Sequence, residues 1–324
     1  MGDSHIFFSD KVLVFHISEI AIALLTLIAL FQTLKILKSW DFNSVSTKQY
    51  ALEKSAYLVV LIIFFILIFK LVLFPYFAFM VDELSDLLAG AMCGAGVINA
   101  NEYGMALLGV KLFTLFMAGV WLIINQEDLK AQNYPYTKKK FTLFILIAIF
   151  IFGEGVLDYL YLSNIQTTTP VSCCSTIYGT QGEGSELPFG LNMQMFLIIF
   201  YLVYLVNSAS NLSHHPLLAM LSALVFLYMG YVSVVNFFGT YIYELPTHKC
   251  PFCMLQGEYY YVGYYIWSSL FLGVFFSIAS YFVKLITTKE LYTVNRYSFI
   301  FNTIFVVINS GYVLSYYLRN GVFL

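Results

Sequence analysis

Long apolar stretches alternate with short polar segments along the whole chain, and this pattern predicts membrane-spanning helices. About 20 helical residues are needed to cross the ~30 Å of hydrocarbon in a bilayer, and eight stretches are long enough. Helices are expected because backbone polar groups must be satisfied internally in lipid. The predicted spans are about 12–37, 56–81, 104–125, 141–163, 191–209, 216–242, 259–284 and 297–318. We therefore expect an all-α fold, a polytopic bundle of about eight transmembrane helices.

Composition supports this interpretation. Hydrophobic residues make up 60% of the 324 positions and charged residues only 10%, whereas about a quarter of a soluble domain is charged. We expect a single integral membrane domain over residues 1–324, with membrane lipid as its surroundings. No basic tract is interleaved with aromatic residues, so nucleic acid is not an expected partner. The chain also has no Walker A motif, Rossmann glycine fingerprint or HExxH motif.

Lysine and arginine in the connections predict the orientation. The connections on one side of the predicted bundle, together with both termini, carry three basic residues, Lys11, Lys249 and Arg319. The connections on the other side carry eleven: Lys35, Lys38, Lys48, Lys54, Lys130, Lys138, Lys139, Lys140, Lys284, Lys289 and Arg296. Because loops rich in Lys and Arg face the cytoplasm, this asymmetry predicts that both termini lie on the outer side. The abundance of Phe, Tyr and Lys suggests a prokaryotic source, hence a multi-pass protein of the bacterial cytoplasmic membrane with its outer loops in the periplasm.

All five cysteines fall in the expected outer loops, at about 82–103, 164–190 and 243–258; they are Cys93, Cys173, Cys174, Cys250 and Cys253. An oxidising exterior permits disulfides at these positions. The adjacent pair Cys173-Cys174 cannot easily close on itself, so each thiol is expected to pair elsewhere, for example with Cys93 or with the last two cysteines. Thiols gathered on one face suggest disulfide exchange or the capture of a soft metal.

The motif Cys250-Pro-Phe-Cys253 directly precedes the seventh predicted span. A helix N-terminus carries a positive dipole end, which favours the thiolate form of a nearby cysteine. The two intervening residues let one sulfur attack a substrate while the other resolves the mixed disulfide. A c-type haem is excluded because Met254 stands where that motif requires histidine.

The sequence Cys250-Pro-Phe-Cys253-Met-Leu-Gln256 resembles the membrane disulfide-generating oxidoreductases of the DsbB and vitamin K epoxide reductase type. The resemblance covers about 15 of the 324 residues. It implies that Cys250 and Cys253 are the pair beside a quinone, that Gln256 occupies the polar position after them, and that loop cysteines pass electrons to this pair. The chain departs from the family at Gly257, which stands where arginine is frequent, and in its eight predicted spans against a four-helix core.

Six ionisable residues lie inside predicted spans, where such groups are costly and mark functional sites by default. Quinone reduction takes up two protons, so we expect Asp158 and Glu19, with Gln256 and Glu258 near the thiols, to contribute to the cofactor site. The alternative is that two lysines and three carboxylates form internal ion pairs that hold helices together. The six residues are His16, Glu19, Lys70, Lys111, Glu154 and Asp158.

Three functions remain open. The leading prediction is a thiol–disulfide oxidoreductase that takes electrons from a periplasmic thioredoxin-like partner through the loop cysteines and delivers them to a quinone. The second is a protein that binds or transports Cu, Zn or Hg, with a metallochaperone as partner and the five cysteines and His248 as ligands. The third is a non-catalytic membrane subunit that anchors a periplasmic partner.

Overall fold

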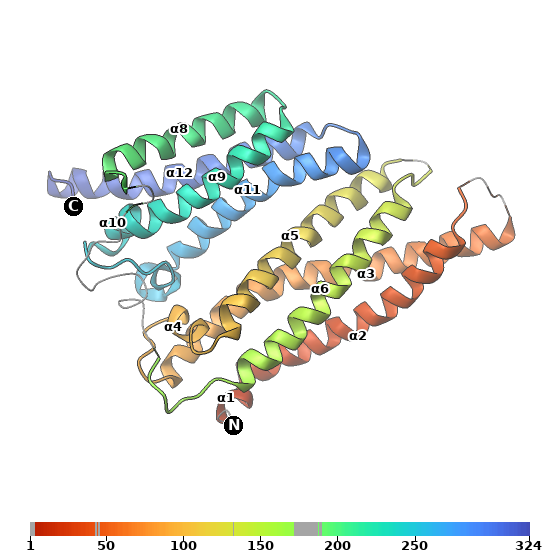
Figure 1. The fold of residues 1–324 in the computed structure, drawn as a ribbon, viewed down its shortest axis with the longest axis horizontal. Coiled ribbons are helices and arrows are strands. Elements are labelled where there is room, and N and C mark those ends of the chain that lie inside the picture. Colours follow the sequence, from red (N-terminus) through yellow and green to blue (C-terminus); the bar gives the residue numbers. More distant parts are fainter. Residues whose placement is uncertain (1–3, 43, 45, 132, 172–186, 188–189) are drawn as a thin grey trace. The chain divides into compact units, whose positions relative to one another are not determined.

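The computed structural model describes residues 4–42, 44, 46–131, 133–171, 187 and 190–324, and every regular element in them is helical (Figure 1). Eight stretches of this described part are long and apolar enough to cross a membrane, so the all-α prediction with its eight spans is confirmed. They are α2 (Asp10–Ser39), α3 (Thr47–Glu83) with the 3-10 turn η1 (Leu84–Leu87), α5 (Tyr103–Leu129), α6 (Thr137–Ser163), α8 (Met193–Leu212), α9 (Pro216–Ser233) continued by the π-helical turn η3 (Val234–Phe238) and α10 (Gly239–Tyr243), α11 (Val262–Thr287) and α12 (Tyr292–Asn320).

Large apolar side chains cover the outer faces of these helices. Ile17 and Leu24 on α2, Phe65 on α3, Ile198 on α8 and Val307 on α12 are all more than half exposed. Such faces are unfavourable in water and match the hydrocarbon of a bilayer. The protein is therefore a multi-pass membrane protein whose helices contact lipid.

Helix ends carry ordinary start and stop signals. The Ser46 hydroxyl accepts a hydrogen bond of 3.3 Å from the Gln49 amide at the start of α3, and the Asn192 side chain caps α8 in the same way. Pro216 begins α9, where its missing N–H costs nothing. Gly321 ends α12 in the left-handed conformation (φ 73°). Local sequence thus sets where the spans begin and end.

The chain divides into two compact units. Unit 1 contains residues 1–89 and 97–169, and unit 2 contains residues 90–96 and 170–324. Among the described residues, unit 1 holds α2, α3, α5 and α6, and unit 2 holds α8, α9 with α10, α11 and α12.

In unit 1, α2 packs against α3 and α6, and α5 packs against α6. Phe141, Phe144 and Ile147 of α6 are fully buried together with Ile63 of α3 and Trp121 of α5. The indole N–H of Trp121 donates a 2.9 Å hydrogen bond to the carbonyl oxygen of Lys140 at the start of α6. This apolar core fixes which faces of the four helices turn inward.

In unit 2, aromatic packing joins three helices. The ring of Phe226 on α9 lies 5.6 Å from that of Phe200 on α8 and 5.8 Å from that of Phe305 on α12. All three side chains are fully buried, and pairs in this range add to the stabilisation from burial.

A buried layer of amides and hydroxyls crosses the same unit; we call it the polar layer, and it consists of Asn207, Asn211, Ser277, Ser298 and Asn302. Asn302 of α12 donates a 2.8 Å hydrogen bond to Asn207 of α8, and Asn211 donates a 2.9 Å bond to Ser277 of α11. The helices approach closely here because Gly273 has no side chain: a Cβ atom on it would lie 1.9 Å from Asn302 Oδ1. The polar layer therefore links α8, α11 and α12 by hydrogen bonds.

Candidate functional site

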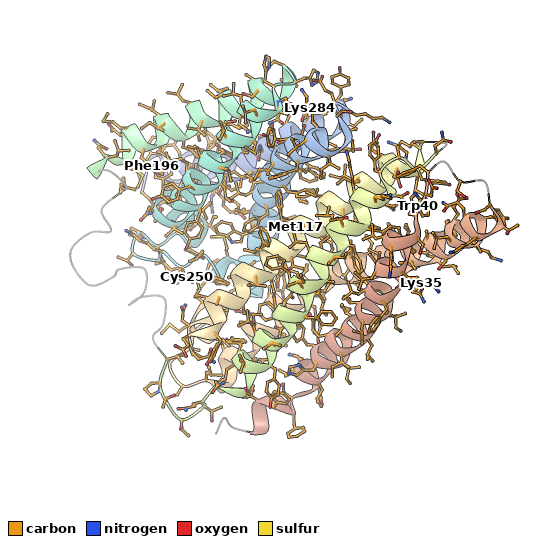
Figure 2. The ribbon with its side chains drawn as sticks, turned by 45° about the vertical axis from the view of Figure 1, so that its right-hand side comes forward. Lys35, Trp40, Met117, Phe196, Cys250 and Lys284 are labelled. Carbon is orange, nitrogen blue, oxygen red and sulfur yellow. The ribbon has the colours of Figure 1, made fainter. Side chains whose placement is uncertain are left out.

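The CxxC motif lies in an irregular connection between α10 and α11. Glu244 ends α10 with a left-handed conformation (φ 53°), and two short 3-10 turns follow, η4 (Cys253–Leu255) and η5 (Gly257–Tyr259). Tyr260 and Tyr261 are both left-handed as well (φ 54° and 56°), which is uncommon for residues other than glycine. Figure 2 labels Cys250, which precedes α11 in this connection, and Lys284, which lies in the last turn of α11.

The helix α11 begins at Val262, three residues after the predicted start of the seventh span near residue 259. Cys253 lies nine residues before that start, so neither cysteine is in the first turn, where the helix dipole acts most strongly. The chain instead folds back over the helix start: a Cβ on Gly263 would lie 2.6 Å from Met254 Cγ. The indole N–H of Trp267, on the second turn of α11, donates a 3.0 Å hydrogen bond to the carbonyl oxygen of Pro251.

Three of the five cysteines come together within unit 2. The Sγ atoms of Cys93 and Cys250 are 3.5 Å apart, and the Sγ atom of Cys253 lies within 4.8 Å of both. All three side chains are buried, Cys93 completely. We call these residues the thiol cluster. Cys173 and Cys174, the other two predicted site residues of this kind, lie outside the described residues.

Hydrogen bonds hold the thiol cluster in place. The Tyr243 hydroxyl donates to the carbonyl oxygen of Cys250 and accepts a 3.1 Å bond from the Met254 amide, so one side chain fixes both sides of the CxxC turn. The amide N–H of Phe252 donates to Cys250 Sγ at 3.3 Å, an interaction that stabilises a thiolate.

The loop that carries Cys93 is tied to the same turn. The side-chain amide of Gln256 donates a 3.2 Å hydrogen bond to the carbonyl oxygen of Met92. At the start of this loop, Gly90 takes a left-handed conformation (φ 84°), and a Cβ there would lie 2.8 Å from the carbonyl oxygen of Val171. The sequence predicted Gln256 as a cofactor contact; in the structure it positions the neighbour of Cys93.

His248 lies beside the thiol cluster. Its ring packs edge-to-face against that of Tyr243, with ring centroids 4.3 Å apart. Burial lowers the pKa of His248, partly opposed by the nearby Cys93. The Nε2 atom is buried and has no hydrogen-bond partner among the described residues, which is costly for a polar atom. The nitrogen atoms of this ring fall outside the 4.8 Å group of sulfurs.

Glu258, the remaining residue predicted near the thiols, is exposed in η5. Its neighbour Tyr259 packs on Tyr243 with ring centroids 4.8 Å apart, and burial, with Cys253 and Glu258 nearby, raises the pKa of the Tyr259 hydroxyl.

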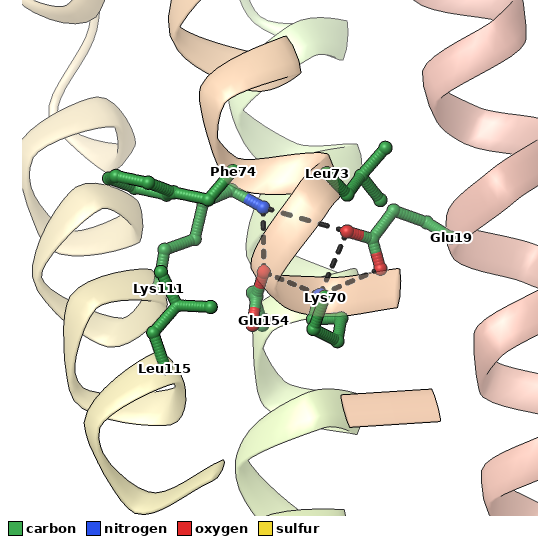
Figure 3. Close-up of a pocket in the computed structure, with 7 residues that line it drawn as sticks. All are labelled: Glu19, Lys70, Leu73, Phe74, Lys111, Leu115 and Glu154. Atoms are coloured by element: carbon green, nitrogen blue, oxygen red, sulfur yellow. Dashed lines mark hydrogen bonds and ion pairs between the residues drawn. The ribbon is translucent and has the colours of Figure 1, made fainter. Parts of the chain in front are cut away.

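A second group of chemistry-bearing side chains lies inside unit 1; we call it the charge cluster, and it consists of Glu19 (α2), Lys70 (α3), Lys111 (α5), Glu154 and Asp158 (α6). Figure 3 shows four of the five around a small cavity. All five side chains are at least nine-tenths buried. Glu19 and Asp158, predicted as cofactor contacts, thus belong to one network of ion pairs.

The lysines bridge the carboxylates. Lys70 Nζ lies 2.8 and 2.9 Å from the two oxygens of Glu19 and 2.7 Å from Glu154 Oε1. Lys111 Nζ lies 2.7 Å from the same Glu154 oxygen and 2.9 Å from Asp158 Oδ2. The ion pairs that the sequence offered as the structural alternative are therefore present.

Sequence reasoning missed the aromatic residues that support both groups. Lys111 Nζ lies 4.9 Å from the ring centroid of Phe15 and 4.7 Å from that of Phe77, so two aromatic faces cover the ammonium group. Tyr243 was not singled out either, because a tyrosine near the end of a span is expected for any membrane protein.

Comparisons of the chain with protein-family models, with curated proteins and with solved structures found no match. The function is therefore inferred from the geometry of the thiol cluster and from the short motif resemblance.

Proposed function

We propose that the protein is a membrane thiol–disulfide oxidoreductase of the bacterial cytoplasmic membrane, with the thiol cluster on the periplasmic side. The observation that carries the proposal is the 3.5 Å separation between the sulfurs of Cys93 and Cys250, with Cys253 in the same group. Cys250 can therefore bond to either of two cysteines, one in its own motif and one in another loop. Disulfide exchange needs this choice of partners.

The proposed cycle conserves atoms and electrons. The Cys93 thiolate attacks Cys250 Sγ in a Cys250–Cys253 disulfide, which forms a Cys93–Cys250 bond and releases Cys253 as thiolate. An external dithiol, for example on a thioredoxin-like protein, then reduces that bond and becomes a disulfide. Reoxidation of the protein passes two electrons and two protons to a membrane quinone, the acceptor suggested by the resemblance of Cys250–Gln256 to the DsbB and vitamin K epoxide reductase type.

The test is thiol-dependent quinone reduction by the purified protein. Cys250→Ser and Cys253→Ser should abolish turnover, and Cys93→Ser should abolish transfer from the external dithiol. Met92→Ser is the matched control, because Met92 is adjacent to Cys93, 73% exposed, and contributes only its carbonyl to the Gln256 bond. Unchanged turnover in Cys250→Ser would refute the proposal.

The burial of the thiol cluster favours a second candidate, a soft-metal site. Sulfurs about 2.3 Å from a tetrahedral Zn²⁺ stand about 3.8 Å apart, close to the observed Cys93–Cys250 separation. Buried thiols are shielded from external thiol partners but can serve together as metal ligands. The ring of His248 would have to move closer to the sulfurs to supply a fourth ligand. Cu(I) and Hg(II) also prefer such thiolate sites.

Metal analysis of protein purified without oxygen separates the two candidates. An oxidoreductase should contain no stoichiometric metal and should show a reducible Cys250–Cys253 disulfide after oxidation. One Cu or Zn per chain, lost in Cys93→Ser and retained in Met92→Ser, would support the metal site and count against the redox cycle.

A further inference from the structure

The charge cluster of unit 1 does not balance. It contains three carboxylates, those of Glu19, Glu154 and Asp158, against the two ammonium groups of Lys70 and Lys111. If all five groups were ionised, one negative charge would remain among side chains that are at most 7% exposed. An uncompensated charge at such a depth costs several kcal/mol, about as much as breaking a buried ion pair. A buried carboxylate in this position takes up a proton instead.

The hydrogen bonds point to where the charge is least compensated. Both oxygens of Glu19 accept from Lys70, and one oxygen of Glu154 accepts from both lysines. Asp158 accepts a single bond, from Lys111 to Oδ2. Its other oxygen, Oδ1, is buried without a partner among the described residues, as is Glu154 Oε2 one turn earlier on α6.

A cavity adjoins the same groups. It is lined by Glu19, Lys70, Lys111 and Glu154 together with apolar residues of α3 and α5 (Figure 3). The cavity has room for about one water molecule, and because Glu154 lines it, such a water could exchange a proton with the cluster through Glu154. The charge cluster therefore has, besides its ion pairs, buried oxygens without a hydrogen-bond partner and an adjoining cavity.

We propose that unit 1 contains an intramembrane proton-binding site, in which Asp158 holds one exchangeable proton within the charge cluster. Uptake converts the Asp158 carboxylate to a carboxylic acid and changes the charge of the cluster from minus one to zero. The new O–H group can donate a hydrogen bond, which its ionised form cannot do. Exchangeable protons on buried carboxyl groups are the chemistry of proton relays in membrane proteins.

The surrounding groups favour a proton over a metal cation. The ionisable groups that act on Asp158 are Lys111 from α5, Glu19 from α2, and Glu154 and Tyr161 on its own helix. Lys70 from α3 and His16 from α2 complete the surroundings, Lys70 through Glu19 and Glu154, and His16 through Glu19 and Lys111. Two of them are ammonium groups that already bond to all three carboxylates, so a metal ion would be placed beside like charges. The Tyr161 hydroxyl is engaged in a 2.9 Å bond to the carbonyl oxygen of Val97.

The experiment is infrared difference spectroscopy of the purified full-length protein as the pH is changed. A protonated carboxyl group gives a C=O stretch that shifts in D₂O, and wild-type protein should show one such group per chain that loses its proton as the pH rises. Asp158→Asn leaves two carboxylates against two ammonium groups and should remove the band. Glu290→Gln, at an exposed carboxylate outside the spans, should leave it unchanged.

Three outcomes would overturn the proposal. The first is wild-type protein with no protonated carboxyl band at any pH at which it stays folded. The second is a band that persists unchanged in Asp158→Asn. The third is a band that disappears on addition of Na⁺ at constant pH, because the site would then bind a metal cation. The absence of a band in wild-type protein overturns the proposal even if Asp158→Asn does not fold, and neither result depends on the chemistry of the thiol cluster.

Discussion

Replacing Lys111 with methionine gives the most quantitative test of the charge cluster. The change keeps most of the apolar volume of the side chain but removes the ammonium group that bonds to Glu154 and Asp158. In this variant Asp158 has no ion-pair partner among the described residues, and Glu154 retains only its ion pair with Lys70. Removing one partner of a buried pair typically costs about 3–5 kcal/mol, and the loss of two cation–π contacts adds about 1–2 kcal/mol. We expect the free energy of unfolding to fall by about 4–7 kcal/mol.

The assay is equilibrium unfolding in mixed detergent micelles, followed by circular dichroism. Lys284→Met is the matched control, since the Lys284–Glu290 pair of 2.7 Å is about 40% exposed and such pairs contribute about 0–1 kcal/mol. The double variant Lys111→Met with Asp158→Asn restores the wild-type excess of one carboxylate and should recover part of the loss. Equal destabilisation by the two Lys→Met changes would refute the reasoning.

Two further predictions concern unit 2. Gly273→Ala should lower the free energy of unfolding by about 1–3 kcal/mol, because its Cβ would lie 1.9 Å from Asn302 Oδ1. Gly311→Ala should have little effect in the same unfolding assay, because its Cβ would meet no described atom within 4 Å apart from its own helix backbone and chain neighbours. Since burial lowers the pKa of His248, folding disfavours its charged form. Its contribution to stability is therefore present above the unfolded pKa of about 6.5 and is lost as the pH falls from there through the lower folded pKa. Thermal unfolding of His248→Asn as a function of pH should be flatter in this range than that of wild type, and identical profiles would contradict the assignment.

The spans were predictable from sequence because a bilayer dictates the length and polarity of any helix that crosses it. Their ends were less so. The second helix begins at Thr47 rather than near residue 56, because it continues through Gln49, Glu53 and Lys54, which a search for apolar runs excludes. The seventh begins at Val262 because the chain before it is occupied by the CxxC turn.

The candidate site was predictable only as a list of residue types. The cysteines all fall outside the apolar stretches, which suggested that they could meet, and three of them do. That Lys70 bonds to Glu19 could not be predicted, because the two residues are 51 positions apart and helices that are apolar all round do not show which face turns inward. The proximity of Cys93 to Cys250, 157 positions away, likewise depends on how a loop folds.

The polar layer of unit 2 has a consequence for how its helices find their places. Leucine- and phenylalanine-rich faces pack almost equally well in many rotations and at many depths, since lipid tails are as apolar as the helices themselves. Asn207, Asn211, Ser277 and Asn302 allow far fewer arrangements, because each vertical slip by one turn would strand amide groups in hydrocarbon. The hydrogen bonds of these few side chains therefore determine the depth and the rotation at which α8, α11 and α12 pack during assembly.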